Sequence, residues 1–146
     1  MNSSSARVHA HAASSLEVTL PLHGLPPTGS ERGPWIAPPR HQFELLRPTI
    51  PTIQELFKHN RLTSRHSESR PLNVFIPPAE GELLYSLVRF LRPHATLEIG
   101  LANGISAVYI AQALCDNQGG QHLAIDPFQS SDWDAAGLQT LARAHL

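Results

Sequence analysis

The sequence predicts an α/β fold in which a β-α-β-α unit opens a parallel sheet, preceded by helices and a disordered tail. Two observations carry this prediction. Residues 97–106 combine an apolar strand, a glycine-rich turn and the start of a helix. Residues 122–126 give a second strand signal, which follows after one helix length and ends in an acid. Strands that alternate with helices in this way are typical of parallel α/β sheets.

The composition narrows the class of protein. Eleven basic and twelve acidic residues give a net charge of −1, which favours neither a nucleic-acid partner nor an anionic membrane. Cys115 is the single cysteine, so the chain forms no internal disulfide and suits a reducing compartment. No apolar run approaches the roughly 20 residues that span a bilayer, and the N-terminus lacks a secretory apolar region. We therefore expect a cytoplasmic protein.

Residues 1–48 predict a disordered tail rich in proline, serine and glycine. Seven of the thirteen prolines lie in this segment, and they remove backbone donors that helices and sheets need. Within it, residues 16–20 alternate between apolar and polar side chains and could form a short strand. The domain proper is expected over residues 49–146.

Two helices are expected before the first strand. Thr52 has capping-box spacing to Glu55 and is the expected N-cap of a helix that ends near Asn60. Residues 61–70 are polar and predict a loop. A second helix should begin after Pro77 and stop at Pro93. Its expected buried face consists of five apolar residues, Leu83, Leu84, Leu87, Val88 and Leu91.

The remaining elements form the β-α-β-α unit itself. The strands are expected at residues 96–99 and 122–125, with a helix over residues 105–114 between them. A last helix should start near Ser131 and turn Leu138 and Leu141 inward. The helix between two parallel strands crosses one face of the sheet.

The turn between strand and helix has the chemistry of a nucleoside site. Gly100 and Gly104 let the backbone turn sharply and approach a ligand, and the amides that open the next helix favour an anion. Asp126 ends the second strand, where a carboxylate can accept both hydroxyls of a ribose. Glu98 lies inside the first strand, and a buried charge there needs a partner.

The spacing separates this turn from two common phosphate loops. Ala stands at position 102, so the pattern is E-x-G-x-x-x-G and not the dinucleotide pattern G-x-G-x-x-G. The chain also lacks the G-x-x-x-x-G-K-[ST] phosphate loop. Residues 98–106 instead resemble motif I of the class I S-adenosylmethionine-dependent methyltransferases, closest to the small-molecule O-methyltransferase branch. Residues 78–84 and 124–127 resemble neighbouring family segments, and the resemblance covers residues 75–146.

This resemblance implies a Rossmann-like sheet, S-adenosyl-L-methionine as cofactor and a small-molecule methyl acceptor. Gly100 and Gly104 would pass beside the cofactor, and Ser106 would bind its methionine carboxylate. Asp126 would hold the ribose, and Glu98 would order the turn near the cofactor's amino group. The implied cofactor-binding set is Glu98, Gly100, Ala102, Gly104, Ser106 and Asp126.

Alternatives to this interpretation stay open. The turn could be a glycine-containing connection of any α/β protein, and Ser106 could be a plain N-cap. A module that binds a nucleoside cofactor without catalysis, an inactive remnant, and another nucleotide-binding α/β protein also fit the residues. No catalytic residue can be assigned. A metal site built from Asp126, Asp132, Asp134 and His122 is not expected, because the first is needed for ribose and the next two suit a helix start.

The family's groups for catalysis follow later strands than the two predicted in this chain. The resemblance therefore implies an incomplete domain, the N-terminal part of a longer methyltransferase. An open sheet edge is then expected, and it would let copies of the chain associate.

Overall fold

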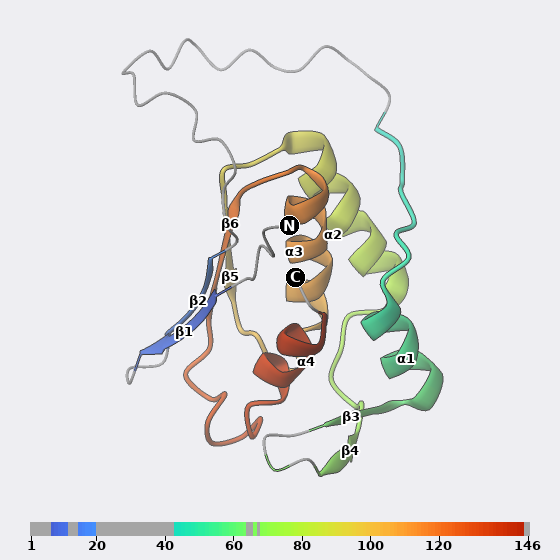
Figure 1. Ribbon diagram of the computed structural model, residues 1–146. Coiled ribbons are helices and arrows are strands. Elements are labelled where there is room, and N and C mark those ends of the chain that lie inside the picture. Colours follow the sequence, from blue (N-terminus) through green and yellow to red (C-terminus); the bar gives the residue numbers. More distant parts are fainter. Residues whose placement is uncertain (1–6, 12–14, 20–42, 64–65, 67, 145–146) are drawn as a thin grey trace, which may run out of the picture.

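The computed structural model describes residues 7–11, 15–19, 43–63, 66 and 68–144. Within them the chain forms an α/β structure with four helices and two small sheets (Figure 1). The larger sheet has the strand order β1-β2-β6-β5. Its strands are β1 (Arg7–His11), β2 (Ser15–Thr19), β5 (Ala95–Ile99) and β6 (Gln121–Ile125).

The parallel pair expected from the sequence is present. Strands β5 and β6 run parallel with Leu97 opposite Leu123, and α3 (Ile105–Asp116) connects them. All four helices lie on the same side of this sheet (Figure 1). The expected helix at residues 105–114 is confirmed and extends two residues further.

The N-terminal segment contributes strands to the sheet. Strand β2 pairs antiparallel with β6, and β1 pairs antiparallel with β2. Residues 16–19 of the expected strand lie in β2. The tail is not wholly disordered, because β2 gains backbone partners from β6 and β1 gains them from β2. Most of the remaining tail lies outside the described residues.

The first helix, α1 (Pro51–His59), starts differently from the expectation. Ile50 is its N-cap and Pro51 its first residue, a position where the missing proline N–H costs nothing. The Thr52 hydroxyl is not a cap, because it donates to the carbonyl of Arg143 at 3.1 Å. The segment predicted as a loop after this helix forms a small second sheet instead. Its strands are β3 (Arg61–Thr63) and β4 (Ser69–Pro71).

Helix α2 (Pro78–Leu91) is present, and the predicted buried face is correct only in part: Val88 is buried and Leu84 packs against the core. Gly81, Tyr85 and Val88 are buried, whereas the leucine stripe of positions 83, 87 and 91 is exposed. The cause is α3: a Cβ built on Gly81 would lie 2.1 Å from Cε2 of Tyr109. The glycine therefore lets the Tyr109 ring pack directly on α2 and selects the glycine face.

The hydroxyl of Tyr85 joins α2 to the end of α3. It donates to Oδ2 of Asp116 at 2.5 Å. Burial and this bond to a carboxylate raise the pKa of Tyr85 to about 12.

Raising the pH should therefore leave Tyr85 protonated well beyond the ordinary tyrosine pKa of about 10. The folded pKa is the higher one, so this group's contribution to stability is complete below about pH 10 and disappears as the pH rises toward 12. Ultraviolet titration of tyrosinate checks this, with Tyr85→Phe as the control that removes the step of Tyr85 and leaves that of Tyr109, whose pKa burial also raises. Ionisation of Tyr85 near pH 10 in the folded protein would contradict it.

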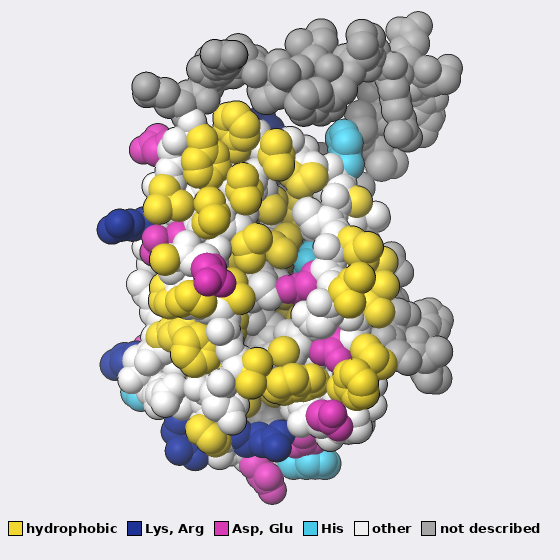
Figure 2. Space-filling model, turned by 180° about the vertical axis from the view of Figure 1, so that it is seen from behind, with side chains coloured by type: hydrophobic (Ala, Val, Ile, Leu, Met, Phe, Trp, Pro, Cys, Tyr) yellow, Lys and Arg dark blue, Asp and Glu magenta, His cyan; other side chains and the backbone are white. Residues whose placement is uncertain are grey.

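The helices cover only one face of the sheet. His122 and Ala124 of β6 are buried beneath α3, but Leu97 and Ile99 on the opposite face of β5 are 62 % and 82 % exposed. The strand expected at residues 96–99 is therefore present, but its apolar side chains Leu97 and Ile99 are not covered. Seen from behind, the molecule carries a broad area of exposed apolar side chains (Figure 2).

The last helix, α4 (Ala136–Ala144), begins five residues later than predicted. Asp134 and Ala135 both have positive φ, at 48° and 57°, which interrupts a right-handed helix. Leu141 is buried and Leu138 packs against the core, as expected. No helix in the described part of the chain has the length and apolar character to cross a membrane.

Candidate functional site

The glycine turn, residues 100–104, joins β5 to α3 at the carboxyl end of the parallel pair. Gly100 and Gly104 adopt φ values of 90° and 77°, which L side chains rarely reach. The amide of Gly100 donates to the carbonyl of Ile125 at 2.8 Å, and that of Gly104 to the carbonyl of Leu101 at 2.7 Å. In open α/β sheets, ligands bind at this end of the strands.

Asp126 fixes the glycine turn from the end of β6. Its Oδ2 accepts from the amides of Leu101 at 2.9 Å and Ala102 at 2.8 Å, and from Nε2 of Gln129 at 3.0 Å. Its Oδ1 accepts from the amide of Phe128 at 2.9 Å. The residue is only 7 % exposed, so these donors replace water around the charge.

The same contacts set the charge state of Asp126. Burial by itself would raise the pKa of the carboxyl. The hydrogen bonds from the Gln129 side chain and from the three backbone amides outweigh it, and together they lower the pKa below the ordinary value. Asp126 is therefore a carboxylate at neutral pH. Its negative charge fixes the glycine turn beside the end of β6.

Glu98 lies within β5 and has two partners under the sheet. Ser106 donates its hydroxyl to Oε1 of Glu98. Nε2 of His122 lies 3.3 Å from Oε2, and Nδ1 of the same ring lies 2.9 Å from the Thr96 hydroxyl. These partners compensate the charge of Glu98 within the strand.

Ser106 is not the N-cap of α3. The cap position belongs to Gly104, with no side-chain capping bond, and the Ser106 hydroxyl is directed to Glu98. The first intrahelical bond runs from the amide of Val108 to the carbonyl of Gly104. The amides before Val108 consequently have no acceptor within the helix.

The two glycines of the turn have different surroundings. A Cβ built on Gly100 meets nothing within 4 Å, so this glycine borders open space. A Cβ on Gly104 would lie 2.7 Å from the carbonyl oxygen of Gly137 in α4. A Cβ on Gly137 would in turn lie 2.5 Å from the carbonyl oxygen of Ala102. Gly104 therefore serves close packing of α4 on the turn, whereas Gly100 leaves room for a ligand.

The structure thus brings the six predicted residues together in two linked groups. Glu98 and Ser106 bond to each other at the base of α3, and Asp126 bonds to Ala102 on the turn. Sequence reasoning missed Gln129, whose Nε2 also donates to the carbonyl of Ala102 at 2.7 Å. Nothing in a single sequence distinguishes this glutamine from any other polar residue of a loop.

The residues weighed as metal ligands do not converge. His122 is beneath the sheet with Glu98, while Asp126 is engaged by the turn. Among the described residues, no three His, Cys, Asp or Glu side chains are placed to hold a metal ion. Burial and the neighbouring Asp116 raise the pKa of the Cys115 thiol, which disfavours the nucleophilic thiolate.

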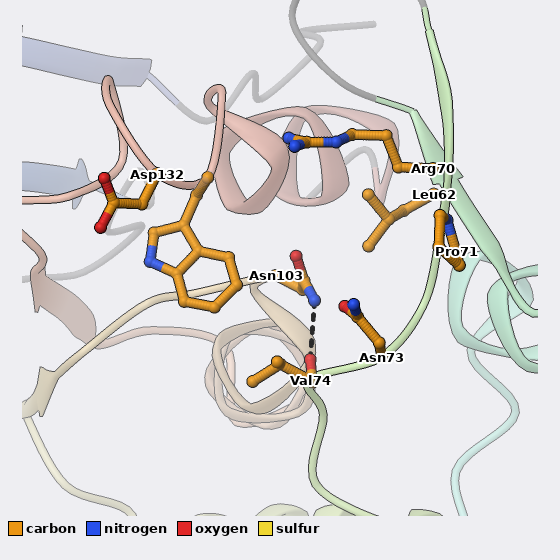
Figure 3. A pocket seen from close by; sticks show the side chains of 8 residues that line it. Leu62, Arg70, Pro71, Asn73, Val74, Asn103 and Asp132 are labelled. Atoms are coloured by element: carbon orange, nitrogen blue, oxygen red, sulfur yellow. Dashed lines mark hydrogen bonds between the residues drawn. The ribbon is translucent and has the colours of Figure 1, made fainter.

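A cavity of about 270 Å³ lies beside the glycine turn (Figure 3). The second sheet, the segment before α2, the turn and the loop after β6 supply its walls. Its lining residues are Leu62, Arg70, Pro71, Asn73, Val74, Asn103, Asp132 and Trp133. None of the six predicted cofactor residues lines it, so the cavity is separate from the open side of Gly100.

Comparisons with family models, curated proteins and solved structures find no match for this chain. The functional interpretation therefore depends on the residues and their geometry.

Proposed function

We propose that this protein binds S-adenosyl-L-methionine at the glycine turn, as part of a Rossmann-like methyltransferase sheet that transfers a methyl group to a small molecule. The proposal is supported above all by the position and the geometry of the glycine turn. It stands at the carboxyl end of two parallel strands, an acid at the end of the second strand fixes it, and it is open beside Gly100. A fixed turn with one open glycine is suited to a ligand that approaches the backbone closely.

The groups around the turn suit the parts of this cofactor. The open side of Gly100 would take its body, because no side chain occupies that space. The free amides that open α3 would face the methionine carboxylate. The Ser106 hydroxyl gives its one proton to Glu98, so the role expected for Ser106 reduces to its backbone amide. Glu98 would attract the cofactor's amino group, since its carboxylate lies directly below the same helix end.

Asp126 suits one ribose hydroxyl better than two. Its Oδ2 already accepts three hydrogen bonds, but Oδ1 accepts only the one from Phe128. A carboxylate oxygen can accept about two. The proposed role is therefore a single bond from Oδ1, while Oδ2 continues to hold the turn.

The sulfonium of the bound cofactor supplies the chemical drive for methyl transfer. The residues of this chain would hold the cofactor in one orientation and exclude water from one side of it. A preformed turn lowers the entropy that binding must overcome, because its backbone is already fixed by Asp126 and Gln129.

Replacing Gly100 by valine should reduce affinity for S-adenosylhomocysteine by about a hundredfold or more, because the branched side chain fills the space beside the turn. The fold should survive: the added Cβ meets no atom within 4 Å, and the positive φ costs about 1–3 kcal/mol. Thermal-shift titration measures both binding and stability in the same samples.

Gly100→Ala is the matched control, since it imposes the same backbone strain with a single added carbon. We expect an intermediate loss of affinity for this variant. Undiminished binding of S-adenosylhomocysteine by a folded Gly100→Val protein would refute the placement of the cofactor beside Gly100.

A further inference from the structure

The cavity beside the glycine turn has the features of a second ligand site. Three regions distant in sequence build it: the β3–β4 hairpin with the stretch to Val74, the glycine turn at Asn103, and the loop carrying Trp133. Its volume of about 270 Å³ is just below the range of about 300–1,000 Å³ that is usual for ligand pockets, so it suits a single small molecule.

Part of the cavity lining is apolar. Leu62, Pro71 and Val74 contribute to it, and Trp133 adds an aromatic side chain to the same lining. Aromatic rings pack favourably against a second flat ring, and such pairs add to the free energy gained from burial alone. The cavity therefore favours a planar, aromatic ligand body.

Arg70 supplies a positive charge on another side of the cavity. Among the described residues it forms no ion pair. A guanidinium presents paired donors that match a carboxylate. Among the described residues, Arg70 is the one basic residue of the lining, and Asp132 adds a negative charge. These charges favour a singly charged carboxylate over a doubly charged phosphate.

Asn103 supplies a fixed acceptor. The residue is only 4 % exposed, and its Nδ2 donates to the carbonyl of Val74 at 2.7 Å. That bond orients the side chain so that Oδ1 points away from Val74 and into the cavity (Figure 3). Within the described part of the chain the only hydrogen bond of this side chain is the one from Nδ2, so an O–H or N–H group of a bound molecule can donate to Oδ1.

We propose that this cavity binds a small aromatic carboxylate that also carries a hydroxyl or amino group. The ring lies against Trp133, the carboxylate pairs with Arg70, and the donor group meets Oδ1 of Asn103. Because the lining shares no residue with the cofactor set, this site does not depend on the proposed function.

Calorimetric titration with 4-hydroxybenzoate tests the proposal on the full chain. We expect saturable binding at one site per chain. Phenol, which lacks the carboxylate, and cyclohexanecarboxylate, which lacks the aromatic ring, should each bind about tenfold more weakly or worse. Phenyl phosphate should also bind more weakly than the carboxylate.

Arg70→Gln should weaken 4-hydroxybenzoate by about tenfold and leave phenol unchanged, because it removes only the charge. Arg143→Gln is the matched control, an exposed arginine outside the cavity, and should bind as the wild type does. Trp133→Leu should weaken every aromatic probe. Saturating S-adenosylhomocysteine and the Gly100→Val substitution should leave the affinity unchanged.

Absence of 4-hydroxybenzoate binding would overturn the proposal, as would equal affinity in Arg70→Gln or tighter binding of phenyl phosphate. These results are independent of whether S-adenosylhomocysteine binds, so the two proposals can fail separately.

Discussion

Replacing Asp126 by alanine should lower the free energy of unfolding by about 3 kcal/mol, because it leaves several buried donors without an acceptor. The amides of Leu101, Ala102 and Phe128 and the Gln129 side chain all donate to this carboxylate. Urea denaturation followed by circular dichroism measures the effect. Asp132→Ala is the matched control, an exposed acid of the same loop, and should change stability little.

The same residue predicts a dependence on pH. Because the folded pKa of Asp126 is lowered, its contribution is complete above the ordinary value of about 3.9 and is lost as the pH falls through the lower folded value. Below about pH 4 the wild type should therefore lose stability faster than Asp126→Asn, which cannot titrate. Equal stability of the wild type and Asp126→Ala at neutral pH would show that the carboxylate does not hold the turn.

Replacing Gly81 by alanine should destabilise the protein by about 2 kcal/mol, although alanine is the better helix former by about 1 kcal/mol. The added methyl group would lie 2.1 Å from the ring of Tyr109, and that ring is itself buried against α2. Overpacking at this contact therefore outweighs the gain in helix propensity.

A double-mutant cycle identifies the cause. Once Tyr109 is replaced by alanine, the methyl group meets no ring, and Gly81→Ala should become neutral or stabilising. Denaturant midpoints of the four proteins provide the coupling energy. If Gly81→Ala has the same effect with and without the tyrosine ring, the Gly81–Tyr109 contact is not what selects the buried face of α2.

Short-range patterns predicted the centre of the fold. β5, α3 and β6 begin and end within two residues of their expected bounds. Apolar runs define these elements, and glycines mark where they end. The pairing of β3 with β4 escaped prediction, because Ser- and Arg-rich residues show no strand periodicity. It depends on contacts across the hairpin, such as the two bonds from the Arg61 side chain to Ser69.

The buried face of α2 could not be read from the helix alone. From the sequence alone, leucines at positions 83, 87 and 91 are expected on a buried helix face, yet in the structure they are exposed. The choice is made by Tyr109, 28 positions after Gly81, and only the folded structure brings the two together.

Part of the candidate site could likewise be predicted from the sequence, and part could not. The spacing of Glu98, Gly100 and Asp126 is local enough to predict a turn at the end of a strand, and the structure places all three there. The packing of Gly104 on Gly137 and the convergence of Arg70, Asn103 and Trp133 on one cavity join separate segments. No spacing rule within one sequence reports such contacts.

Calorimetric titration of the wild-type chain with S-adenosylhomocysteine, alongside NADH, tests the central claim most directly. The geometry of the glycine turn predicts saturable binding of S-adenosylhomocysteine at one site and no binding of NADH. Binding of NADH in its place, or no heat with either compound, would contradict the claim that this turn holds S-adenosylmethionine.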